Sequence, residues 1–298
     1  MLAIILALAS AIGYGSSDFA AGLASRTASV IQVTLLACLT ATVVVLVALP
    51  FAADHRPSGA SLAWGAAAGA GGTLGGIALY LGFRYAAFSV AAPLSAVGTA
   101  GFSVLAGLLW GERPSTVALI GIGLALPAIV SVSASAAGAE HAGSEAGQAE
   151  NEEGGHSGRP AAGVVAGLIA GACFALLLIG LDRAGSGSGL WPVATAEVAE
   201  LAVALAAAAL TRNLRLPAGR PRWLAVITGV AGAAGTILYF LASHDGLLAV
   251  TAVLTSLYPA STIVLARLVL GERLTRLRLT GLVLAGGCVA LIAAGGAG

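Results

Sequence analysis

Three carboxylic acids lie within long apolar stretches of this chain, where ionisable side chains are costly and usually face a cavity. Glu197 and Glu200 are three residues apart, so in a helix both side chains project from one face. Two carboxylates this close in a low-dielectric environment do not both ionise readily, so we expect one of them to hold a proton. Such a pair suits a proton carrier or a site for a cationic group. The alternative is that hydroxyls of neighbouring helices satisfy both acids.

Asp18 is the third of these acids. It follows Ser10, Tyr14 and Ser17 along one face of a helix expected over residues 2–24. Asp18 lies nearer the end of this stretch than Glu200 does, so helix capping is the alternative to a binding role.

Hydroxyl side chains form two further polar lines in apolar stretches. The residues of these lines are Ser95, Thr99 and Ser103 in one stretch, and Thr251, Thr255, Tyr258 and Thr262 in the other. Isolated hydroxyls in spans commonly bond to their own backbone, but a repeated line favours a cavity wall. Pro93 and Pro259 each remove one backbone hydrogen bond in these stretches, which frees carbonyl groups and permits a bend.

The elements that carry these residues are predicted to be transmembrane helices. Only 9% of residues are charged and the mean hydropathy is +0.98, whereas soluble domains carry roughly 25% charged residues. A span needs about 20 apolar residues, and the predicted spans are 2–24, 30–50, 61–83, 87–110, 115–135, 161–181, 190–210, 223–243, 247–270 and 277–295. The chain is therefore expected to be an all-α integral membrane protein with ten spans.

The two halves of the chain repeat one another. The segment from Val90 to Gly111-Glu112-Arg113 aligns without a gap, at an offset of 160 residues, on the segment from Val250 to Gly271-Glu272-Arg273. We therefore divide the chain into a first five-helix repeat (1–135), an acidic Gly/Ala-rich linker (136–160) and a second five-helix repeat (161–298). Because five is an odd number of spans, the second copy starts on the opposite side of the membrane, and the repeats are expected to be inverted.

The duplicated Gly-Glu-Arg ends, the opening Gly15-Ser16-Ser17-Asp18-Phe19 and the segment Ser256-Leu257-Tyr258-Pro259 resemble the EamA-type family of the drug/metabolite transporter superfamily. This resemblance covers nearly the whole chain outside the linker. It implies a ten-helix secondary transporter, often an exporter of amino acids, metabolites or drugs, that works without ATP hydrolysis. For the Gly-Glu-Arg ends we expect a structural role, in which the glutamate caps neighbouring backbone groups and the arginine anchors the helix end at the headgroups.

The expected function is secondary transport of a small metabolite by alternating access, coupled to protons or driven by a substrate gradient. A cavity with acids and hydroxyls but no basic residue in mid-span suits a cationic or amphipathic amino-acid-like compound better than a phosphate. The alternatives are an integral-membrane enzyme acting on lipids and a non-transporting scaffold. No recurrent spacing of His and carboxylates indicates catalysis, and the chain has no Lys for a phosphate-binding loop. We therefore expect no enzyme activity, cofactor, metal or nucleic-acid partner, and a location in a bacterial-type cell membrane.

Two observations disagree about orientation. The resemblance implies that both termini lie in the cytoplasm, whereas arginine-rich short loops normally stay there. If both termini are cytoplasmic, as the resemblance implies, the cytoplasmic loops hold Arg56, Arg113 and Arg183. The loops on the opposite side then hold Arg26, Arg84, Arg159, Arg212, Arg215, Arg220, Arg222, Arg273, Arg276 and Arg278. The arginine distribution therefore favours termini outside.

Overall fold

The regular structure of the chain is helical throughout the part that the computed structural model describes, residues 1–52, 57–85, 88–145, 160–271 and 276–295. The helices are α1 (Leu2–Ser25), α2 (Val30–Ala48), α3 (Gly59–Tyr85), α4 (Phe88–Leu109), α5 (Thr116–Glu145), α6 (Pro160–Arg183), α7 (Trp191–Leu210), α8 (Arg220–Asp245), α9 (Leu248–Thr255), α10 (Tyr258–Leu270) and α11 (Arg276–Gly295). Two short 3-10 helices, η1 (Leu49–Ala52) and η2 (Ser186–Ser188), lie in connections.

Most of these helices are long and apolar enough to cross a membrane. Among the described residues, 7 segments meet that standard, one of them formed by α9 and α10 together, and three shorter apolar segments lie at 94–109, 116–131 and 279–295. Large apolar side chains such as Ile5, Ile12 and Leu105 are exposed on the outside of the bundle. A water-soluble protein would bury such a surface, so lipid is the solvent for these faces.

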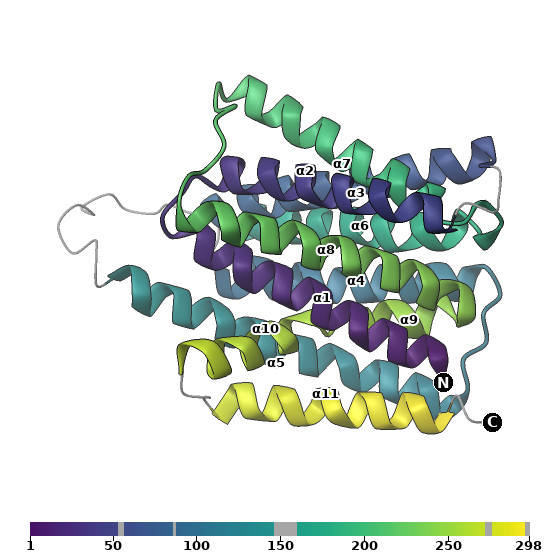
Figure 1. Cartoon of the computed structure of the whole chain (residues 1–298). Helices are drawn as coiled ribbons and strands as arrows, with labels where there is room; N and C mark the ends of the chain where they lie inside the picture. Colours follow the sequence, from purple (N-terminus) through teal and green to yellow (C-terminus); the bar gives the residue numbers. More distant parts are fainter. Residues whose placement is uncertain (53–56, 86–87, 146–159, 272–275, 296–298) are drawn as a thin grey trace.

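The helices pack in pairs that join the two halves of the chain. α1 lies along α8, α3 lies along α6, and α5 lies along α11. α4 also packs on α6, while α9 and α10 pack on α1. Figure 1 shows the start of α1 and the end of α11 at one end of the bundle, whereas α5 ends and α6 begins towards the opposite end. The first helices of the two halves therefore run in opposite directions.

Glycines allow several of these helix pairs to approach closely. A Cβ added at Gly13 of α1 would come 2.9 Å from the Cα of Gly235 on α8. On α3, a Cβ at Gly65 or Gly69 would collide with the backbone of α7 at Pro192 and Ala196. Small residues at such contacts let backbones meet without intervening side chains, which is how helices associate in lipid.

Two elements differ from the sequence prediction. α5 continues to Glu145, ten residues beyond the predicted end of the fifth span, because Ala and Glu are favourable in helices even outside the membrane. The ninth span is broken, with Ser256 and Leu257 between α9 and α10. Pro259 therefore lies in the first turn of α10, where its missing N–H removes no helical bond. Pro93 lies within α4, and its side chain is outside the described residues.

Candidate functional site

Glu197 and Glu200 both project from α7 towards the interior of the bundle. Glu197 is 3% exposed, and its carboxyl group lies near the Thr236 hydroxyl on α8. The Tyr14 hydroxyl of α1 donates to the same Thr236 oxygen at 3.2 Å. Thr236 in turn donates to the backbone oxygen of Gly232 at 3.1 Å. A side-chain hydrogen bond thus joins α1 to α8 beside the Glu197 carboxyl of α7.

Glu200 lies one helical turn from Glu197 and is partly accessible. Its carboxylate packs against Gly72 of α3, where an added Cβ would come 2.5 Å from Oε1. Thr73, the next residue of α3, donates its hydroxyl to the backbone oxygen of Glu200 at 3.4 Å. The two acids are close enough to act on each other electrostatically, as their spacing in the sequence predicts.

Asp18 is accessible although it lies on an inward-facing side of α1. Ile5 and Ile12, both well exposed, mark the outer face of this helix. At about 100° per residue, Asp18 lies roughly 120° away from Ile12, on the face between Ala11 and Tyr14. Ala11 is 3% exposed and packed inside the bundle. Asp18 therefore lies on the side of α1 that faces the bundle and not on its lipid-facing side.

Two tyrosines lie near these acids. Tyr14 is within electrostatic range of Asp18, Glu197 and Glu200, and Tyr258 is within electrostatic range of Asp18. Tyr258 is half-buried at the start of α10, directly after the break in the ninth span. We define the acid site as Tyr14, Asp18, Glu197, Glu200, Thr236 and Tyr258. Five of these six residues were singled out from the sequence.

The hydroxyl line of α4 lies apart from the acid site. Ser95 and Ser103 are buried, and neither hydroxyl has a hydrogen-bond partner among the described residues. Thr99 donates to Ser95 O at 2.9 Å in its own helix and approaches Gly171 O of α6 at 3.5 Å. These side chains lie where α4 packs on α6, so they occupy a helix interface in this conformation.

The hydroxyls of α9 and α10 also face neighbouring helices. Thr255 is 2% exposed and donates to Ala7 O of α1 at 3.5 Å. Thr262 donates to Gly15 O of α1 at 3.2 Å. Thr251 bonds to Leu247 O in the turn before it, at 3.0 Å. Of the polar residues predicted in this stretch, only Tyr258 is placed at the acid site.

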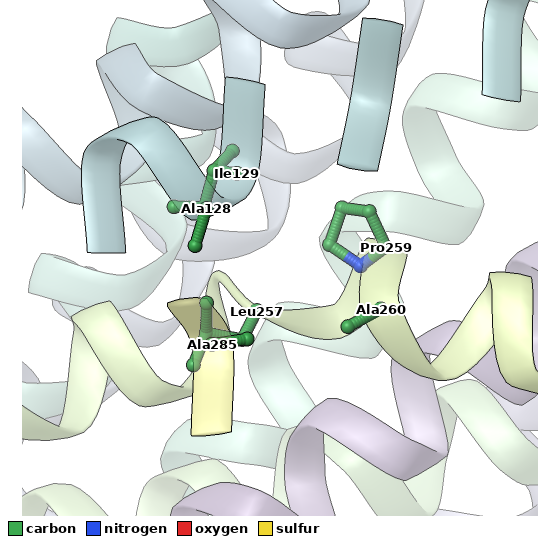
Figure 2. Close-up of a pocket in the computed structure, with 6 residues that line it drawn as sticks. All are labelled: Ala128, Ile129, Leu257, Pro259, Ala260 and Ala285. Atoms are coloured by element: carbon green, nitrogen blue, oxygen red, sulfur yellow. The ribbon is translucent and has the colours of Figure 1, made fainter. Parts of the chain in front are cut away.

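A small pocket lies beside the broken ninth span. Figure 2 shows its lining residues, Ala128, Ile129, Leu257, Pro259, Ala260 and Ala285. All six side chains are apolar, so this pocket has no group that could bind a charged ligand. Within the described part of the chain, no group of three or more His, Cys, Asp or Glu side chains is placed to hold a metal ion.

The first Gly-Glu-Arg end caps a helix of the other half. Gly111 adopts φ +89°, which ends α4 and turns the chain back. Glu112 then accepts hydrogen bonds from the backbone N–H groups of Leu248 and Ala249, at 2.6 and 2.9 Å. Arg113 is exposed. In the second copy, Gly271 also has a positive φ of 68° and ends α10, whereas Glu272 and Arg273 lie outside the described residues.

A second contact lies at the same end of the bundle. The guanidinium group of Arg183, the last residue of α6, lies 4.7 Å from the ring centroid of Trp110. This geometry allows a cation–π interaction. The end of α4 therefore contacts both α6 and α9.

The model of the EamA-like transporter family matches residues 1–134 and again residues 161–294. The chain belongs to the EamA-like transporter family. Two matches of one family model cover both halves of the chain, and the unmatched residues between them include the acidic segment. Membership makes this a multi-pass membrane protein of a transporter family.

A solved crystal structure of another protein is also similar to this chain. The TM-score is 0.69 over 95% of both chains, at 16% sequence identity. At that identity the similarity shows a shared fold only, because proteins with such different sequences can differ in function. No curated protein matches the chain.

Proposed function

We propose that this EamA-like protein is a secondary transporter in a cell membrane that moves a small cationic or zwitterionic metabolite. The acid site is the proposed binding site, with Glu200 and Asp18 contacting the cationic group. Export is the direction that we propose, since the family resemblance implies it. The acid site is also the proposed place where a proton competes with the substrate.

The observation that carries this proposal is the presence of three acids on the bundle-facing sides of α1 and α7, two of which, Asp18 and Glu200, are accessible. Asp18 comes from α1, and Glu197 and Glu200 come from α7. Among the described residues, the basic side chains lie at or near helix ends, as Arg183, Arg220 and Arg267 illustrate. A carboxylate in the membrane interior that lacks a cation from the protein is suited to take one from the substrate.

The spacing of Glu197 and Glu200 on one face of α7 supports proton binding. Two carboxylates this close in a low-dielectric environment do not both ionise readily, so we expect one of them to hold a proton. In such a pair, binding of a cation and release of a proton are linked.

Alternating access of two inverted five-helix halves is the proposed mechanism. The pairs α1–α8 and α3–α6 support it, because each joins the first helix of one half to the third helix of the other. The opposite directions of α1 and α6 support it as well (Figure 1). Rocking of such halves around a site near the midplane can expose that site to each side in turn.

Transport by the purified protein in liposomes tests this function. We expect uptake of members of a panel of primary amines and zwitterions, accelerated by a pH gradient, and no uptake of sugar phosphates. The Glu200→Gln variant is the matched control, since the amide keeps the shape of the side chain but does not titrate. Uptake of phosphates, or of amines at equal rates by both proteins, would contradict the proposal.

A further inference from the structure

Four glycines of α3 lie on one face of that helix, at Gly65, Gly69, Gly72 and Gly76. At 3.6 residues per turn, this spacing keeps all four within about 60° of one another around the axis. Leu74, by contrast, is exposed on the outer face. The glycine face is therefore directed into the bundle, towards α7.

The first three of these glycines are in close contact with α7. A Cβ at Gly65 or Gly69 would collide with the backbone of α7, and a Cβ at Gly72 would come 2.5 Å from Glu200 Oε1. At Gly76 the situation changes, because an added Cβ would have no atom within 4 Å. The two helices thus touch as far as Glu200 and separate one turn beyond it.

The space at Gly76 lies one helical turn beyond Glu200. Gly72 and Gly76 are four residues apart on the same face of α3, and the carboxylate of Glu200 packs against Gly72. A cationic group held by Glu200 would therefore place its neighbouring atoms beside Gly76.

We propose that Gly76 is the size-limiting wall of the acid site. The absence of a side chain at this position leaves the room that the substrate occupies next to its cationic group. This inference rests on the proposed function, and it adds a specificity-determining residue that has no polar group of its own. A larger side chain at position 76 excludes bulky cations and leaves small ones bound.

Cysteine labelling tests the space without any substrate. In a chain whose Cys38, Cys173 and Cys288 are replaced by alanine, Gly76→Cys is treated with two water-soluble thiol reagents, cationic trimethylammonioethyl methanethiosulfonate and anionic sulfonatoethyl methanethiosulfonate. The rates are normalised to those of Ser186→Cys, an exposed position in a connection. We expect labelling at position 76 with a cationic preference on the order of tenfold, because focused negative potential raises the local cation concentration.

A matched glycine provides the control for labelling. A Cβ at Gly101 of α4 also has no atom within 4 Å, but Gly101 lies beside the exposed Phe102 and Leu105 on the outer face. Gly101→Cys should not react, because a thiol in lipid does not form a thiolate. Adding Glu200→Gln should reduce the cationic preference at position 76. An unreactive Gly76→Cys, or equal rates for the two reagents after normalisation, would overturn the inference.

The size limit is measured by transport of tetramethyl-, tetraethyl- and tetrapropylammonium into liposomes. Gly76→Leu should lower transport of the largest ion that the unmodified protein carries by at least about tenfold, equivalent to about 1.4 kcal/mol, and retain the smallest. Gly101→Leu should keep the original limit. An unchanged size limit for transported ions in Gly76→Leu would contradict the size-limiting role of Gly76 but would not contradict the proposed function. If the unmodified protein carries none of these ions, the cationic substrate class fails, and the labelling rates still decide whether Gly76 borders the space.

Discussion

The carboxylate of Glu112 accepts a hydrogen bond from the backbone N–H of Leu248 at 2.6 Å, and its second oxygen accepts from Ala249 at 2.9 Å. These two groups are among the unpaired N–H groups that begin every helix. Gly107 makes the contact possible, because a Cβ there would collide with Glu112 Oε2. A residue of the first half thus caps α9 in the second half, and this contact closes the bundle at the end that holds the termini.

We expect Glu112→Ala to lower the free energy of unfolding by about 1 kcal/mol, as the loss of a helix cap does. For a chain of this size, the thermal midpoint in detergent should fall by roughly 2 to 4 °C. Glu112→Gln should have a smaller effect, because one acceptor oxygen remains. The control is Asp245→Ala, an exposed carboxylate near the same end of the bundle. Equal midpoints for the two alanine variants would show that the cap contributes nothing to stability.

Glu200→Gln should reduce proton-coupled transport by about tenfold or more, because a hydrogen bond to a charged group contributes about 1.5 to 3 kcal/mol. Glu197→Gln should do less harm, since Glu197 is buried against Thr236 and only Glu200 is partly accessible. Initial uptake rates between about pH 5 and pH 8 provide the measurement, with the amount of inserted protein as the control for folding. A Glu200→Gln protein that transports normally across this range would refute the coupling role.

The sequence alone predicted most of the acid site, and the reason is physical. Carboxylates and tyrosines inside apolar stretches are rare and costly, so Tyr14, Asp18, Glu197 and Glu200 could be recognised one at a time. Thr236 and Gly76 could not, because hydroxyls and glycines are common in this chain and only the packing of α3, α7 and α8 brings them to the acids. That these residues function together remains a prediction.

Contacts between the two halves were also beyond sequence reasoning. The duplication predicted a capping role for Glu112, but periodicity within one stretch does not reveal that its partners are Leu248 and Ala249. The broken ninth span was missed for a related reason. Pro259 was expected to bend one helix, and the chain instead ends α9 before Ser256 and starts α10 with the proline in its first turn. Where a span breaks depends on its tertiary contacts as much as on its proline.

Close packing of α3 on α7 gives a third prediction. Gly69→Ala should destabilise the protein by about 1 to 3 kcal/mol, because overpacking forces helices apart. Gly22→Ala is the matched control, since a Cβ at Gly22 has no atom within 4 Å. This control should be neutral or stabilise the helix by up to about 1 kcal/mol, the usual difference between glycine and alanine. The measurement is the thermal midpoint of each variant in the same detergent. A Gly22→Ala protein that is less stable than Gly69→Ala would contradict the close packing of α3 on α7.

The arginine distribution predicts which way the bundle faces. The start of α1 and the end of α11, which lead to the two termini, lie at one end of the bundle (Figure 1). Of the arginines that follow or begin described helices, Arg113 and Arg183 lie at that end, and Arg26, Arg212, Arg215, Arg220, Arg222 and Arg276 lie at the other. Short loops rich in arginine normally stay in the cytoplasm. We therefore expect both termini outside the cell, contrary to the orientation usual in the family.

Reporter fusions at Gly298 decide the orientation. With the termini outside, a reporter that is active only in the cytoplasm should be inactive, and one that is active only outside should be active. The same two reporters fused after Leu210, at the opposite end of the bundle, should give the reverse pattern. In this orientation Gly76, in the second half of α3, lies nearer the cytoplasmic end of the bundle, so Gly76→Cys should be labelled faster in inside-out vesicles than in intact cells. Strong cytoplasmic activity at Gly298 would show that the family orientation holds in spite of the charge distribution.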